Sequence, residues 1–188
     1  MKSKFFYRDI VVEVPDSVYF PRDDSIMLAE LLEREKPETA LDLGCGSGFL
    51  AILLAKRGCK VTAADVNPKA VEAAEKNAAM NFVDIKIIES DLFQNIKYDF
   101  DLIVFNPPYL PFEPYDLQWS GGIDLIKKFL EDAKSRLKKD GKIIFVVSNL
   151  TAPEKEIIEV IEKNGYKYKI FARRKIPWEE LIAFELKL

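Results

Sequence analysis

Four consecutive residues, Asn106, Pro107, Pro108 and Tyr109, have the chemistry to hold a planar nitrogen group. The two prolines fix two φ angles and lack N–H groups, so the neighbouring carbonyl oxygens remain available as acceptors. The Asn106 side-chain oxygen is another acceptor, and the Tyr109 ring can stack on a flat group. A bound NH2 group would donate one proton to Asn106 and the other to the Pro107 carbonyl. The turn therefore predicts a site for an amide or amine, with a plain proline-rich turn as the alternative.

A glycine-rich loop, Gly44-Cys45-Gly46-Ser47-Gly48, follows a short apolar segment that contains Asp42. Glycines let the backbone approach a ligand without a Cβ clash. The G-x-G-x-G spacing differs from the usual dinucleotide fingerprint, and the loop lacks the lysine of a P-loop. Asp65 ends the next apolar segment, where an acid can accept hydrogen bonds from ribose hydroxyls. These residues indicate a nucleoside ligand. The alternatives are a tight strand-to-helix turn and an NAD-dependent enzyme.

The composition excludes several mechanisms. The chain has no histidine, which excludes histidine-based triads, general bases and metal ligands. Two cysteines, Cys45 and Cys59, are too few for a disulfide framework or a four-cysteine zinc site, so we expect no metal site. The formal net charge of −3 argues against a protein that mainly coats nucleic acid. No apolar run approaches the roughly 20 residues of a membrane helix, so we expect a cytoplasmic protein without membrane contact.

Strands and helices alternate along most of the 188 residues. This alternation predicts an α/β fold with a doubly wound, mostly parallel sheet. We expect a single domain over residues 1–188, in which residues 1–36 form a packed strand and helix extension. The expected strands are 7–14 in the extension and 40–43, 60–64, 85–89, 101–105, 142–148, 166–171 and 181–186 in a seven-stranded sheet. The expected helices begin near Asp23 or Asp24 and cover 49–56, 68–80, 122–138 and 152–163.

The motifs fall where this sheet would place a ligand. Parallel strands present their carboxyl ends at one edge, and ligands bind there in open α/β sheets. The glycine loop, Asp65, the Glu89-Ser90-Asp91-Leu92 segment and the 106–109 turn all follow expected strands. The irregular stretch 107–121 is long for a compact domain, and such loops are more often functional than accidental.

Residues 42–48 resemble motif I of class I S-adenosylmethionine-dependent methyltransferases, and 106–109 resembles the N-P-P-Y motif of amino methyltransferases. The resemblance implies a Rossmann-like sheet with an antiparallel last strand. It implies S-adenosyl-L-methionine as cofactor and S-adenosyl-L-homocysteine as product. The catalytic residues would be Asn106, Pro107, Pro108 and Tyr109. The residues that the resemblance assigns to cofactor binding are Tyr19, Asp24, Ser25, Asp42, Gly44, Cys45, Gly46, Gly48, Asp65, Val66, Asp91, Leu92 and Asn106.

Two further segments resemble the HemK-type protein methyltransferases. Tyr19-Phe20-Pro21-Arg22-Asp23-Asp24-Ser25 is similar to their Tyr-x-Pro-x-x-Asp-Ser/Thr segment. Trp119-Ser120-Gly121-Gly122 resembles the Trp-x-Gly-Gly segment of the short archaeal and eukaryotic branch. That branch modifies the glutamine of the Gly-Gly-Gln motif in class 1 translation release factors. The resemblance therefore implies a release factor as protein substrate, contacted by Trp119, Gly121 and Gly122.

Several of these residues have a structural alternative. Helix capping explains Asp24 and Ser25 without a ligand, and a cap before Leu92 explains Asp91. A hydrophobic staple explains Tyr19. A core or lid position explains Trp119.

Other functions and partners compete with this hypothesis. An RNA or DNA base methyltransferase is the alternative enzyme, because Lys167, Lys169, Arg173, Arg174 and Lys175 form a basic cluster. A solvated strand explains the same cluster. A non-enzymatic accessory subunit is a third hypothesis, which the intact 106–109 turn disfavours. The family resemblance also implies a small zinc-containing activator subunit, covering a sheet edge formed by Ile85-Lys86-Ile87-Ile88.

Overall fold

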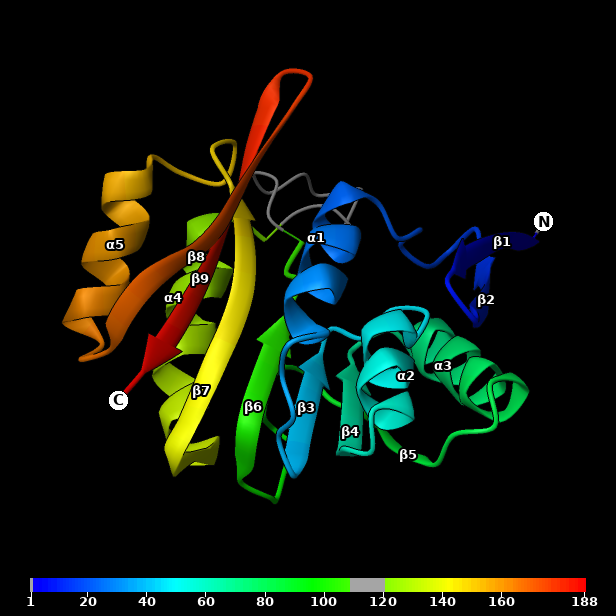
Figure 1. Cartoon of the computed structure of the whole chain (residues 1–188). Helices are drawn as coiled ribbons and strands as arrows, with labels where there is room; N and C mark the ends of the chain where they lie inside the picture. Colours follow the sequence, from blue (N-terminus) through cyan, green and yellow to red (C-terminus); the bar gives the residue numbers. More distant parts are fainter. Residues whose placement is uncertain (1, 109–120) are drawn as a thin grey trace.

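A computed structural model describes residues 2–108 and 121–188 of the protein. A seven-stranded sheet lies at the centre of the molecule (Figure 1). Strand β9 pairs antiparallel with both β7 and β8, and the other neighbouring pairs are parallel. The α/β fold with an antiparallel last strand is therefore confirmed. In sheet order the strands are β5 (Ile85–Glu89), β4 (Lys60–Asp65), β3 (Thr39–Leu43), β6 (Phe100–Phe105), β7 (Leu137–Ser148), β9 (Glu179–Lys187) and β8 (Lys167–Ile176).

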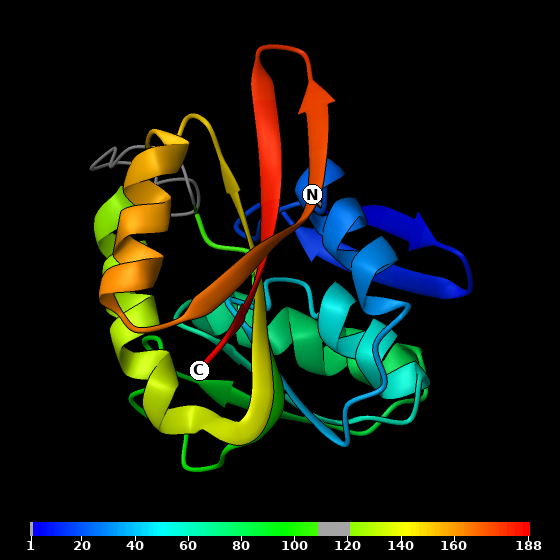
Figure 2. The ribbon, with the colours of Figure 1, turned by 60° about the vertical axis from the view of Figure 1, so that its left-hand side comes forward.

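Helices cover both faces of this sheet (Figure 2). Helices α1 (Asp23–Leu32), α2 (Phe49–Lys56) and α3 (Pro68–Met80) share one core cluster, and α4 (Gly122–Ala133) and α5 (Glu154–Lys163) share another. Successive residues of β6 alternate between the clusters, because side chains of a strand point to opposite faces. Leu102 and Val104 join the first cluster, while Ile103 and Phe105 join the second.

The strand order reverses between β3 and β6, which lie side by side in the middle of the sheet. From β3 the chain proceeds through β4 to the β5 edge and then returns to β6. Such a reversal leaves a crevice at the carboxyl ends of the two central strands. The glycine loop follows β3 and the Asn106 turn follows β6, so the fold brings both motifs to this crevice.

The N-terminal region differs from the sequence-based expectation of one strand over 7–14. It forms a hairpin of β1 (Lys2–Tyr7) and β2 (Ile10–Pro15), in which Tyr7 pairs with Ile10. Arg8 occupies the turn with φ 52°, a conformation that usually favours glycine or asparagine. The expectation was wrong because Arg8, which takes the left-handed turn position, is not a residue type that marks a tight turn.

Two other element boundaries also differ. The helix expected over 122–138 ends at Ala133, a short 3₁₀ turn (Lys134–Arg136) follows, and β7 begins at Leu137. Leu137 is buried and pairs with Phe100, so pairing extends the strand beyond its apolar run. Helix α1 has Arg22 at its N-cap with no side-chain cap bond, so capping by Asp23 or Asp24 is wrong. Among the described helices, none is long and apolar enough to cross a membrane.

Candidate active site

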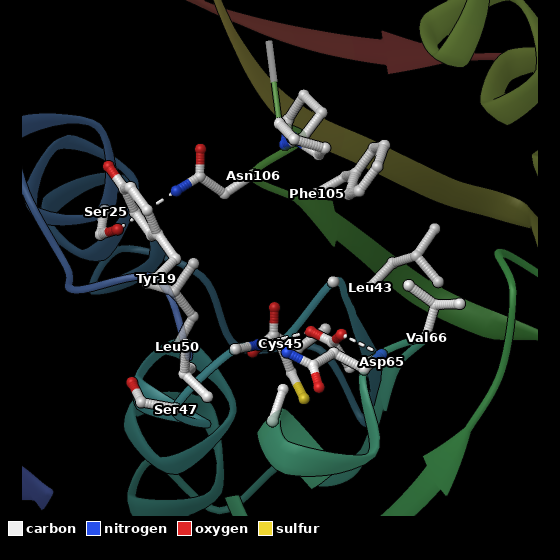
Figure 3. Close-up of a pocket in the computed structure, with 18 of the residues that line it drawn as sticks. Tyr19, Ser25, Leu43, Cys45, Ser47, Leu50, Asp65, Val66, Phe105 and Asn106 are labelled. Carbon is white, nitrogen blue, oxygen red and sulfur yellow. Dashed lines mark hydrogen bonds between the residues drawn. The ribbon is translucent and has the colours of Figure 1, made fainter. Parts of the chain in front are cut away.

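A pocket of about 640 Å³ lies at the carboxyl ends of β3, β4, β5 and β6 (Figure 3). The start of α1 and the preceding segment close one side of it through Tyr19, Asp24 and Ser25. A volume of a few hundred Å³ suits a ligand of nucleoside size. The expected site residues that line the pocket are Tyr19, Asp24, Ser25, Asp42, Gly44, Cys45, Gly46, Asp65, Val66, Asp91, Leu92, Asn106, Pro107 and Pro108.

The glycine loop joins β3 to α2 through three residues in the left-handed region, Gly44 (φ 64°), Gly46 (φ 53°) and Gly48 (φ 80°). A Cβ on Gly44 would lie 3.2 Å from the Phe105 ring. Gly48 does not line the pocket; a Cβ there would lie 3.0 Å from the Cβ of Ala74 in α3. Gly44 and Gly46 therefore bring backbone to the pocket, whereas Gly48 permits close packing of α2 against α3.

Two carboxylates lie beneath this loop, and backbone N–H groups bind both. Asp65 accepts hydrogen bonds from the Gly46 and Asn67 N–H groups, each at 2.9 Å. Burial raises the pKa of Asp65, although these hydrogen bonds favour the charged form. Asp42 is 1% exposed and accepts a bond of 2.9 Å from the Ala51 N–H. Burial, with a smaller contribution from Asp65, raises the pKa of Asp42 to about 7.

The end of β5 contributes Asp91 and Leu92 to the same pocket. Leu92 is buried and has φ 46°, and its carbonyl accepts a bond of 2.8 Å from the Ser90 hydroxyl. The Asp91 side chain is half-exposed and accepts a bond of 3.0 Å from Gln94 Nε2. No helix begins at Leu92 among the described residues, so the helix-cap alternative for Asp91 is wrong.

Asn106 ends a chain of side-chain hydrogen bonds from the start of α1 (Figure 3). Asn106 Nδ2 donates to Ser25 Oγ at 3.1 Å, and Ser25 Oγ donates to Asp24 Oδ1 at 3.1 Å. The Tyr19 hydroxyl donates to Asp24 Oδ2 at 2.7 Å. Asn106 Oδ1 is buried and has no hydrogen-bond partner within the described part of the chain. This arrangement fixes the amide by its nitrogen and leaves its oxygen available as an acceptor.

The expected substrate residues are only partly described. Tyr109 and Trp119 lie outside the described residues. Gly121 and Gly122 lie at the start of α4 and do not line the pocket. A Cβ on Gly121 would lie 2.6 Å from the Pro108 carbonyl oxygen, so this glycine lets α4 begin against the proline turn.

Sequence reasoning missed the residues that form the apolar part of the pocket. Most of them lie beside the glycine loop or at a strand end, Leu125 lies in α4, and their sequence signal is that of ordinary core residues. Those residues are Val18, Leu43, Phe49, Leu50, Phe105 and Leu125. The Ser25–Asn106 contact was also missed, because 81 positions separate the two residues and no local pattern links them.

Comparisons with known proteins agree with this geometry. The family model described as methyltransferase small domain matches residues 23–172. A putative protein N5-glutamine methyltransferase of Methanocaldococcus jannaschii is 39% identical over 185 residues, with 93% of each chain covered. A release factor glutamine methyltransferase of Lactococcus lactis is 32% identical over 157 residues, which cover 73% of this chain and 58% of that protein. The chain thus spans less than two thirds of the length of this bacterial relative.

The fold is also found among solved structures. The complex of Mtq2 and Trm112 from E. cuniculi, described as responsible for methylation of the eRF1 translation termination factor, gives a TM-score of 0.74 at 27% identity. The match covers 91% of this chain and 98% of that chain. The resemblance to class I methyltransferases of the HemK type is therefore confirmed, and the chain belongs to the methyltransferase small domain family.

Proposed function

We propose that the chain transfers a methyl group from S-adenosyl-L-methionine to the side-chain nitrogen of a glutamine, in the Gly-Gly-Gln motif of a class 1 release factor. The relatives support the substrate class, since two of them are named glutamine methyltransferases. Asn106 Oδ1 is the observation that carries the proposal. It is a buried acceptor without a partner among the described residues, and it belongs to the turn expected to receive an NH2 group.

The residues around the pocket fit the cofactor. An acid at the end of the second parallel strand suits ribose hydroxyls, and Asp65 occupies that position. Gly44 and Gly46 have no Cβ atoms, so their backbone could lie directly beside the cofactor. Leu43, Leu50 and Phe105 supply apolar surface in the same pocket. Asp91 and Leu92 lie where the adenine ring would bind. When bound, the cofactor supplies an electrophilic methyl group on a sulfonium.

The chain would position the acceptor nitrogen and accept its N–H protons. Asn106 Oδ1 would accept one N–H and the Pro107 carbonyl the other, and Tyr109, which lies outside the described residues, is expected to stack on the amide plane. These residues would hold the acceptor nitrogen in line with the methyl group that the bound cofactor supplies, and one N–H proton would leave to water once the methyl group has moved from sulfur to nitrogen. Positioning and partial negative charge beside a nitrogen that becomes positive account for the rate. No histidine base is needed, in agreement with the composition.

The basic cluster gives little support to a nucleic-acid substrate. Lys169 pairs with Glu185 at 2.9 Å, Arg173 pairs with Glu154 at 2.7 Å, and Arg174 pairs with Glu30. Binding to phosphates requires cations that are free to replace counterions. Because acids of the same chain already neutralise three of its five cations, the cluster fits a solvated strand better than a nucleic-acid surface.

The β5 edge is where a small activator subunit would bind. Strand β5 is the outermost strand on its side of the sheet, and Ile85, Ile87 and Ile88 are only partly buried. A bare apolar edge invites pairing with another chain. The Mtq2–Trm112 neighbour supports a two-subunit assembly. This part of the proposal would be contradicted if the chain alone methylated release factor at full rate and adding such a subunit left that rate unchanged.

A competition assay tests the proposed function. Release factor, tRNA, rRNA and DNA are offered together with radiolabelled cofactor, and the label is followed into each. We expect label in the release factor. Label in nucleic acid but not in protein would overturn the substrate class while leaving the enzyme class intact.

A further inference from the structure

The β8–β9 hairpin projects beyond the rest of the sheet (Figures 1 and 2). The last residue of β7, Ser148, pairs with Leu181, whereas β8 and β9 stay paired as far as Ile176 and Glu179. Within the described part of the chain, the tip therefore has no third strand paired beside it. Strand β8 runs in the same direction as β7, so the tip extends from the carboxyl edge of the sheet, where the pocket also lies.

Trp178 at this tip has a conformation and an exposure that stability does not explain. Pro177 and Trp178 form the two-residue loop between the paired residues Ile176 and Glu179. Trp178 has φ 69°, at a turn position that normally requires glycine or asparagine. Its side chain is 96% exposed, so the strain is not offset by packing. Phe82 combines the same two features, so Trp178 is set apart by its place at the carboxyl edge of the sheet, on the side where the pocket lies.

The hairpin is fixed to the body of the molecule at its base. Arg174 pairs with Glu30 of α1 and donates to the Asp23 carbonyl at 3.3 Å. Glu180 N–H donates to Asn149 Oδ1 at 2.7 Å, and Asn149 N–H donates to the Glu180 carbonyl at 3.1 Å. Because α1 also carries Ser25, which holds Asn106, the hairpin and the acceptor site are fixed to the same helix. The indole is thus presented at a defined place relative to the pocket.

We infer that Trp178 is an anchor for the protein substrate, inserting into an apolar hollow on the folded protein beside its acceptor glutamine. This inference rests on the proposed function. Tryptophan is the residue type most enriched among anchors of protein interfaces. A nucleic-acid partner fits the tip poorly, because Glu179 directly follows the indole and the nearby Arg173 and Arg174 are already paired with acids. A subunit at the β5 edge would sit at the opposite side of the sheet.

The test compares Trp178→Ala with a matched control, Phe82→Ala, on the full chain with intact release factor. Phe82 is 95% exposed and has φ 58°, but it lies in the connection between α3 and β5. We expect Trp178→Ala to lower kcat/KM by about tenfold or more through KM, with kcat and cofactor Kd unchanged. Phe82→Ala should match the wild type.

A second variant, Trp178→Gly, separates docking from folding. Glycine adopts a positive φ without strain, so its Tm should equal or exceed that of the wild type while KM rises as for alanine. Wild-type kinetics in both Trp178 variants would overturn the inference. A lower kcat with an unchanged KM would also overturn it, as would a loss of RNA methylation in place of release factor methylation. A wild-type chain that methylates no release factor would contradict the proposed function itself.

Discussion

The two sides of the pocket differ in whether their buried polar groups have hydrogen-bond partners within the described part of the chain. Beneath the glycine loop, backbone N–H groups of Gly46, Asn67 and Ala51 bind the carboxylates of Asp65 and Asp42. Across the pocket, Asn106 Oδ1 is buried and finds no partner in the described part of the chain. An unsatisfied buried acceptor costs about 1–3 kcal/mol. One side is therefore internally bonded, and the other leaves an acceptor that a donor from outside would satisfy.

This difference assigns distinct tasks to the two sides. The side of β3 and β4 holds its shape through its own hydrogen bonds and would receive the cofactor as a preformed cradle. The side of β6 and α1 would recognise the acceptor, because an N–H donor there satisfies an oxygen that the fold leaves unpaired. Substitutions on the first side should change mainly cofactor binding, and substitutions on the second should change mainly turnover.

The largest effect should come from removing the unpaired oxygen. Asn106→Ala should lower kcat by about 100- to 1,000-fold, the range seen when one preorganised polar group is lost from an active site. Cofactor Kd, measured by calorimetry, should stay within about threefold. Asn106→Asp keeps an oxygen acceptor and should retain more turnover than alanine. Turnover within a few fold of the wild type in Asn106→Ala would show that the oxygen is not used.

Asp65→Ala should weaken cofactor binding, because Asp65 lies on the β3 and β4 side of the pocket. Hydrogen bonds to a charged group contribute about 1.5–3 kcal/mol, so cofactor Kd should rise by roughly 10- to 100-fold. The control is Asp101→Ala, because Asp101 also accepts bonds from a backbone N–H and side chains, from Thr39 and Lys138, but lies away from the pocket. That variant should lose stability while binding cofactor normally. Equal loss of cofactor affinity in both variants would contradict a specific role for Asp65.

The buried acid Asp42 should make stability depend on pH. Its pKa of about 7 in the folded chain lies above the ordinary value of 3.8, so the folded state holds the proton more tightly. The contribution of Asp42 to stability is therefore fully present at low pH and is lost as pH rises from about 4 through about 7. Between about pH 5 and about pH 8, the wild type should lose about 3 kcal/mol more unfolding free energy than Asp42→Asn. Urea unfolding across this range measures it, and parallel pH profiles would refute it.

The smallest effect should come from the residue that orients Asn106. Ser25→Ala removes the neutral hydrogen bond to Asn106, worth about 0.5–1.5 kcal/mol, together with the bond from Ser25 to Asp24, so kcat should fall by about two- to tenfold. Ser25→Thr retains the hydroxyl and should restore most of the loss. Steady-state kinetics with saturating cofactor distinguish this effect from weaker cofactor binding. If Ser25→Ala weakened only cofactor binding, Ser25 would instead belong to the cofactor-binding side of the pocket.

The difference between the two sides also explains what the sequence could predict. Asp65 and the glycine loop were found because parallel strands bring their carboxyl ends to one edge, whatever the details of packing. The bond from Ser25 to Asn106 depends on where α1 packs, which no local pattern specifies. Apolar lining residues such as Leu50 and Phe105 have the same signal as core residues. The hairpin tip was missed because Pro177-Trp178 lacks the glycine or asparagine that usually marks a tight turn.

The unpaired Asn106 oxygen is expected to receive an N–H from a planar amide. Mass spectrometry can test this on release factors that carry glutamine, glutamate or lysine at the Gly-Gly-Gln position. We expect one methyl group on the glutamine side-chain nitrogen, and no methyl group on glutamate or lysine at that position. Methylation of the lysine variant at the glutamine rate, or of the glutamine factor at another residue, would contradict it.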